Sequence, residues 1–169
     1  MIAKKIEKAL NEQVTIEAES SQFYLAMASW AEVEGYNGVA RFLYAHSDEE
    51  REHMLKLIKF INERGGQAKI PKLDEPPSEF KGIHDIFSTL YSHEVRVTKS
   101  INNVVDICLS EKDYTTHNFM QWYVSEQIEE EGLARTLVDK VELIGDNKSG
   151  LYLFDRDLES MNVPMIDPK

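Results

Sequence analysis

The chain has 169 residues, of which 42% are hydrophobic and 29% charged, and its net charge at neutral pH is −11. This acidic excess excludes binding to nucleic acid or to an anionic membrane through general electrostatic attraction, because phosphates would be repelled. The single cysteine, Cys108, excludes an internal disulfide and a cysteine-rich metal domain, and no apolar run near the N-terminus predicts a signal peptide or a membrane span. We therefore expect one cytoplasmic domain covering residues 1–169.

Two long helices are predicted in the first half of the chain, because apolar residues recur there with helical spacing. The first is expected from about residue 2 to 34, where Gly35, Asn37 and Gly38 favour a turn. The second is expected from about residue 39 to 64 and ends at the glycines of the RGG sequence. Residues 67–82 then contain three prolines and no helical period, which predicts an extended connection over the surface.

Three further helices are predicted after this connection. The third is expected over residues 83–110, the fourth over about 116–144, and a short amphipathic fifth over about 148–160, followed by a C-terminal tail to residue 169. The long connection lets the chain return along the bundle before the third helix begins. The pattern therefore predicts an all-α four-helix bundle over about residues 2–145, with a long crossover between helices 2 and 3 and a short fifth C-terminal helix.

Each of the four long helices carries a glutamate near the middle of its otherwise apolar stripe, at Glu17, Glu50, Glu94 and Glu130. A carboxylate in an apolar interior costs several kcal/mol unless it is paired or protonated, and four at one level would also repel one another. Two divalent cations would neutralise the four charges. His53 lies three residues after Glu50 on the same helix face, so it could supply a nitrogen ligand. The pattern indicates a dinuclear metal site.

Carboxylate oxygens with one imidazole suit iron or manganese, whereas zinc could compete for the site but cannot change its oxidation state. The HSDEEREH sequence is not the HExxH motif of zinc proteases. His46 lies two turns from His53, too far along the helix to share its metal ion. We expect His46 to be a buried, hydrogen-bonded histidine.

Several of these residues together resemble the ferroxidase centre of bacterial non-haem ferritins. They are Glu17, Tyr24, the EEREH sequence ending in His53, Glu94, and the EQIEEE sequence from Glu126 to Glu131. The resemblance covers nearly the whole chain and includes the helix order, the long crossover and the fifth helix. It implies a ferritin-like bundle.

The resemblance also implies roles for individual residues. Glu17, Glu50 and His53 would hold one iron, and Glu50 would bridge to a second iron held by Glu94 and Glu130. Gln127 would lie beside the metals as a hydrogen-bonding residue. A third iron position would involve Glu49, Glu126, Glu129 and Glu130, although a solvated acidic face is the alternative for the first three of these residues.

Two aromatic residues have open roles. Tyr24 lies two turns after Glu17 on the same stripe and could hydrogen-bond a metal ligand or supply an electron during oxidation. Trp122 could also lie near the metals. Core packing is at least an equal explanation for both, because buried aromatic residues are common.

Differences between this sequence and related families narrow the choice of family. Bacterioferritins and rubrerythrins have a second ExxH on the fourth helix, where this chain has Glu130. Bacterioferritins bind haem through a methionine just before the metal-ligand histidine, and Glu52 stands there, so we expect no haem. Animal ferritins line an iron channel with carboxylates at the positions of His117 and Met120, which leaves the iron uptake route open.

The resemblance implies that the chain is a ferroxidase that stores iron. Fe(II) would be oxidised to Fe(III) by O₂ or H₂O₂ and kept as a ferric oxyhydroxide mineral inside a homo-oligomeric cage, a 24-mer with 432 symmetry. The residues themselves indicate only apolar surface for association, around the fifth helix and the crossover. The alternatives are a di-iron oxygenase or reductase acting on an organic substrate, and a non-catalytic bundle that holds zinc or manganese.

Overall fold

The computed structural model describes residues 2–160, so the predicted C-terminal tail lies outside the described residues. The helices are α1 (Lys4–Val33), α2 (Asn37–Glu63), α3 (Ile83–Ser110), α4 (Tyr114–Ile144) and α5 (Lys148–Ser160). Their bounds lie within two residues of the predicted ones. The left-handed backbone of Gly35 and Gly65, with φ of 86° and 74°, follows α1 and α2 and explains why those helices end there.

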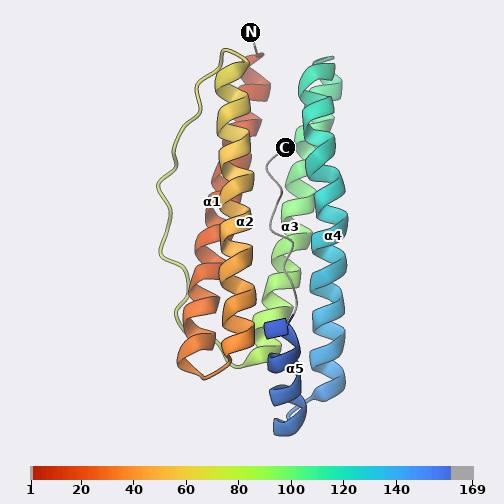
Figure 1. Ribbon diagram of the computed structural model, residues 1–169. Helices are drawn as coiled ribbons and strands as arrows, with labels where there is room; N and C mark the ends of the chain where they lie inside the picture. The colour runs from red at the N-terminus through yellow and green to blue at the C-terminus, as the bar shows by residue number, and fades with distance from the viewer. Residues whose placement is uncertain (1, 161–169) are drawn as a thin grey trace.

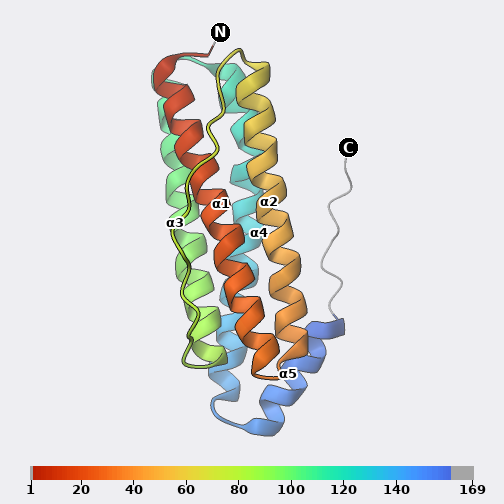
Figure 2. The ribbon, with the colours of Figure 1, turned by 90° about the vertical axis from the view of Figure 1, so that its left-hand side faces the viewer.

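The four long helices form one bundle in which α1 pairs with α2 and α3 pairs with α4 (Figure 1). The segment between α2 and α3 runs the length of the bundle on its outside (Figure 2). This confirms the long crossover, and with it the all-α four-helix bundle with a short fifth helix. Within residues 2–160, no helix is both long and apolar enough to cross a lipid bilayer.

The apolar core consists of two separate clusters, one toward each end of the bundle. The N-terminal cluster includes Leu10, Leu57 and Tyr123. The α5 cluster includes Tyr24, Leu43, Phe87, Leu137 and Phe154. Between the two clusters, the inward positions of the helices are occupied by buried polar side chains: Glu17, Ser20, His46, Glu50, His53, Glu94 and Gln127. A buried polar layer therefore divides the bundle.

The short helix α5 packs closely against the start of α2 (Figure 1). A Cβ atom added to Gly38 would lie only 1.8 Å from the backbone oxygen of Asp155. The Asp155 side chain accepts a hydrogen bond of 2.9 Å from the backbone N–H of Val39. Only glycine permits this approach.

The Gly38→Ala variant is expected to be less stable than the unmodified chain by about 1–3 kcal/mol, because the two backbones must separate. The Gly132→Ala variant is a matched control, since Gly132 also lies in a long helix but an added Cβ would meet nothing within 4 Å. It is expected to gain about 0.5–1 kcal/mol from the higher helix propensity of alanine. Denaturant unfolding of both variants measures the difference, and equal stability would contradict the close approach.

Candidate metal centre

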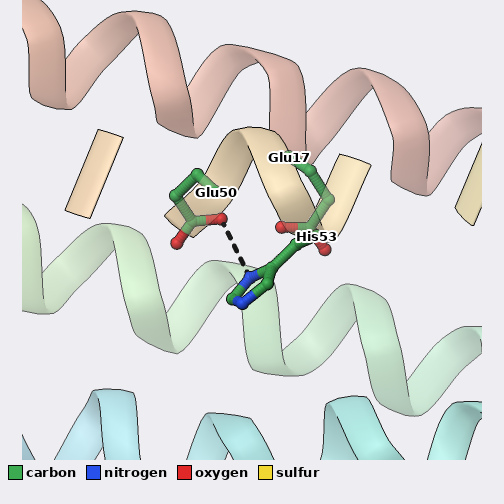
Figure 3. A group of neighbouring side chains, drawn as sticks. All are labelled: Glu17, Glu50 and His53. Carbon is green, nitrogen blue, oxygen red and sulfur yellow. Dashed lines mark ion pairs between the residues drawn. The ribbon is translucent and has the colours of Figure 1, made fainter. Parts of the chain in front are cut away.

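Three of the five residues predicted to hold the two metals lie together in the polar layer. Glu17 comes from α1, and Glu50 and His53 come from neighbouring turns of α2, so that their side chains point toward one another (Figure 3). One ligand atom from each residue lies within 4.8 Å of the other two. The Nδ1 atom of His53 is 3.5 Å from Oε2 of Glu50. Their exposed fractions are 1%, 3% and 4%, so water is largely excluded.

Each of these residues has one buried polar atom without a hydrogen-bond partner within residues 2–160. These atoms are Oε2 of Glu17, Oε2 of Glu50 and Nε2 of His53. An unpartnered buried polar atom costs about 1–3 kcal/mol, and more when it carries charge. Two oxygens and one imidazole nitrogen are suitable ligands for a first-row divalent cation. The three residues, two carboxyl groups and one imidazole with ligand atoms close together, therefore suit a divalent metal ion.

Glu17 is held by a short chain of hydrogen bonds from α3. Ser100 donates to Oε1 of Gln13 at 2.7 Å, and Nε2 of Gln13 donates to Oε1 of Glu17 at 2.8 Å. Gln13 is fully buried one helical turn before Glu17. The chain orients the carboxylate and leaves its second oxygen free for a metal.

Glu94 of α3 lies in the same buried layer but is already hydrogen-bonded on both oxygens. Tyr24 donates to Oε1 of Glu94, and Nε2 of Gln127 donates to Oε2 at 2.9 Å and to the Glu94 backbone oxygen at 3.2 Å. These contacts place Tyr24 and Gln127 beside the predicted ligand. Glu94 is not among the residues that cluster with Glu17, Glu50 and His53.

Glu130 of α4 belongs to a second cluster, with His46 and Glu49 of α2. Its Oε2 atom is 3.6 Å from Nε2 of His46, and Oε2 of Glu49 is 3.8 Å from Nδ1 of the same ring. Glu126 is half-buried and Glu129 is exposed, and neither joins a cluster of possible ligands among the described residues. Of the four residues predicted for a third iron, Glu49 and Glu130 therefore lie close together.

The comparisons with known proteins decide the family. The Ferritin-like domain family matches residues 7–144. A bacterial non-heme ferritin of Campylobacter jejuni is 44% identical over 161 residues, which is 95% of this chain and 96% of that protein. The chain belongs to the ferritin family. A bacterial non-heme ferritin of Escherichia coli O157:H7 is 35% identical over 162 residues, covering 96% of this chain and 98% of that protein.

Solved structures agree with this assignment. The open pore ferritin of Archaeoglobus fulgidus superposes on this ferritin with a TM-score of 0.94 at 40% sequence identity, covering 96% of this chain and all of that one. The resemblance predicted from the ligand pattern and the helix order is therefore confirmed.

Burial controls the protonation of the carboxyl groups in the metal-free site. It raises the pKa of Glu17 well above its ordinary value, and the nearby Glu50 carboxylate raises it further. The pKa of Glu50 is raised in the same way, first by burial and then by Glu94. Burial, with Glu94 and Glu49 nearby, raises the pKa of Glu130 to about 9. These groups tend to hold protons until cations displace them.

His46 behaves differently from the carboxyl groups around it. Burial lowers the pKa of His46 to about 4, although its hydrogen bond to the Phe42 carbonyl acts in the opposite direction. The ring is therefore neutral near pH 7, and its contacts with Glu49 and Glu130 are not ion pairs. His46 is buried and hydrogen-bonded, as expected from the sequence.

The positions of Tyr24 and Trp122 are compatible both with core packing and with a role beside the metals. Trp122 contacts His53, with ring centroids 5.1 Å apart, and Nζ of Lys56 lies 3.3 Å from the centroid of the Trp122 ring. Tyr24 hydrogen-bonds Glu94 and also packs in the α5 cluster.

Met120, at one of the positions compared with the iron channel of animal ferritins, is fully buried in the N-terminal cluster, so core packing accounts for this residue.

Two residues near the site had no role assigned from the sequence. The inward position of Gln13, four residues before Glu17, is a signal for a hydrogen bond to that glutamate. Ser100 gives no such signal, because its partner depends on how α3 lies against α1.

Proposed function

We propose that this ferritin stores iron by oxidising Fe(II) at a dinuclear ferroxidase centre in the polar layer. The observation that carries the proposal is the set of unpartnered, buried atoms on Glu17, Glu50 and His53. These residues would receive the first Fe(II). Glu50 would bridge to a second Fe(II) held by Glu94 and Glu130, with Gln127 and Tyr24 orienting Glu94 through their hydrogen bonds.

The carboxylate-rich surroundings favour oxidation of bound iron. Loss of an electron raises the charge of each ion, and anionic ligands stabilise Fe(III) more strongly than Fe(II). The electrons pass to O₂ or H₂O₂, which is reduced. Hydrolysis of the ferric product releases protons and leads to ferric oxyhydroxide. Iron is thus a substrate that passes through the site.

We further propose that the chain is a single domain and assembles with copies of itself into a 24-mer cage with 432 symmetry, in the cytoplasm. Large apolar side chains are exposed on the surfaces predicted for association. Ile70 on the crossover is 75% exposed, Leu143 at the end of α4 is 88% exposed, and Tyr152 on α5 is 68% exposed. Burying them between subunits would remove apolar area from water.

Mixing the metal-free protein with excess Fe(II) in air tests this function. A storage ferritin is expected to take up many irons per chain and to sediment as a large particle. Uptake that stops at about two irons per chain would favour an oxygenase, whereas binding without accelerated oxidation would favour an inert metal-binding bundle. A stable monomer or dimer would contradict the cage.

The Gln13→Leu variant is expected to bind the first Fe(II) about 10- to 100-fold more weakly, because Glu17 loses the donor that orients it. Anaerobic titration with Fe(II) measures the change. Gln22→Leu, the same substitution at an exposed position of α1, is the matched control and is expected to leave binding unchanged. Equal affinity in both variants would show that Gln13 does not position Glu17.

A further inference from the structure

Trp122 lies at the edge of the proposed metal centre. Its ring, on α4, packs against the ring of His53 nearly at right angles, with centroids 5.1 Å apart and an interplanar angle of 79°. Indole is electron-rich and is readily oxidised. Because His53 is a proposed iron ligand, H₂O₂ that is reduced at the centre would react close to this ring. Trp122 is only half-buried, so its neighbours do not enclose it completely.

Lys56 of α2 places a positive charge on the face of the same ring. Its Nζ atom lies 3.3 Å from the ring centroid of Trp122. Lys56 follows His53 by three residues, so both side chains project from the same side of α2 toward Trp122. Burial lowers the pKa of the Lys56 ammonium, and the nearby Glu126 carboxylate acts in the opposite direction. The half-buried side chain remains charged near pH 7.

This contact makes the Trp122 ring harder to oxidise, for two electrostatic reasons. The ammonium is attracted by the electrons above the ring, and this attraction weakens when electrons are withdrawn. Oxidation also places positive charge on the ring, and the ammonium repels that charge at short range. Both effects favour the reduced ring.

The second tryptophan of the chain, Trp30, has no such contact. It is also half-buried and packs edge-on against Phe80, with centroids 5.9 Å apart, beside the α5 cluster. Within residues 2–160, no lysine or arginine lies over its ring. Trp30 therefore serves as an internal reference for the oxidation of an indole that has no cation above it.

We propose that Lys56 protects Trp122 from oxidation by the H₂O₂ that reacts at the neighbouring metal centre. The reaction that Lys56 suppresses is oxygen transfer, in which the O–O bond breaks, one oxygen forms a C–O bond to the indole and the other leaves as water. H₂O₂ instead takes one electron from each of two Fe(II) ions and, with two protons, becomes two waters. The inference rests on the proposed function for the source of peroxide chemistry beside His53, and it makes Lys56 a residue that acts through Trp122.

Peptide mass spectrometry of the full chain after repeated additions of Fe(II) and H₂O₂ tests the proposal. The oxidised fraction of Trp122 is expected to rise about tenfold in Lys56→Leu and to stay near the unmodified level in Lys56→Arg, which keeps the cation. Lys59→Leu, at an exposed position of α2, is the matched control and is expected to change nothing. The oxidised fraction of Trp30 should be the same in all four proteins.

Equal oxidation of Trp122 in Lys56→Leu and the unmodified chain would overturn the proposal. So would equal increases in Lys56→Leu and Lys56→Arg, because the shape of the side chain and not its charge would then protect the ring. Absorbance of the ferric product in the same samples reports iron oxidation separately. If that oxidation is not accelerated, the proposed function fails, and the same comparison in metal-free protein with a chelator and H₂O₂ alone still decides the role of Lys56.

Discussion

The Glu50→Ala variant is expected to oxidise Fe(II) about 100-fold more slowly than the unmodified ferritin in the initial phase. Glu50 is the residue proposed to contact both irons, and its removal also leaves His53 without the carboxylate 3.5 Å from its ring. Without Glu50, the two Fe(II) ions that donate the electrons would no longer share a ligand. Absorbance of the ferric product after mixing with Fe(II) in air measures the initial rate.

Two further variants make this result specific. Glu52→Ala removes a carboxylate two residues away on the exposed face of α2 and is expected to oxidise iron at the unmodified rate. His53→Ala is expected to show a similar loss to Glu50→Ala, because it removes the only nitrogen ligand proposed for the first iron. Unchanged initial rates in both Glu50→Ala and His53→Ala would contradict the assignment of the centre.

The Glu50→Gln variant is expected to be more stable than the unmodified ferritin when both are metal-free, by about 1–3 kcal/mol at pH 8. Glutamine has nearly the same shape as glutamate but is neutral when folded and unfolded, so its burial beside Glu17 and Glu94 requires neither a buried charge nor the uptake of a proton. Denaturant unfolding in the presence of a chelator measures the difference. A metal-free variant that is less stable than the unmodified protein would show that the buried carboxylate is not a source of instability.

The pH dependence follows from the direction of the pKa shifts. The pKa values of Glu17, Glu50 and Glu130 are raised in the folded chain, so folding favours the protonated forms. Their contribution to stability is present below the unfolded value of about 4.5 and is lost as the pH rises toward about 9, the folded value of Glu130. The stability of the metal-free protein should therefore fall over this range, and Zn(II) should restore it in the unmodified chain more than in Glu50→Gln.

Local patterns in the sequence account for most of the fold and for the ligands that share a helix. Helical periodicity, the turn glycines and the prolines of the crossover predict all five helices. The inward stripes place Glu17, Glu50, His53 and Glu94 in the polar layer, because a stripe specifies which face of a helix is buried. These predictions need no knowledge of how one helix lies against another.

The remaining features depend on contacts between helices, which a single stripe does not specify. Glu130 faces His46 and Glu49 because of the relative rotation of α4 and α2. The bond from Ser100 to Gln13 depends on how far α3 is shifted along α1. The approach of Asp155 to Gly38 joins residues that are distant in the chain, and the turn-forming tendency of Gly38 explains only its local conformation.

The polar layer separates the apolar packing at the two ends of the bundle. Leu57 belongs to the N-terminal cluster and Leu137 to the α5 cluster, and the two clusters have no residue in common. Shortening one of these side chains leaves a void that its own cluster must fill, while the opposite end keeps its packing. A substitution at one end thus has to fit only the side chains of its own cluster. Substitutions in the polar layer are limited instead by the need to keep its carboxyl and imidazole groups.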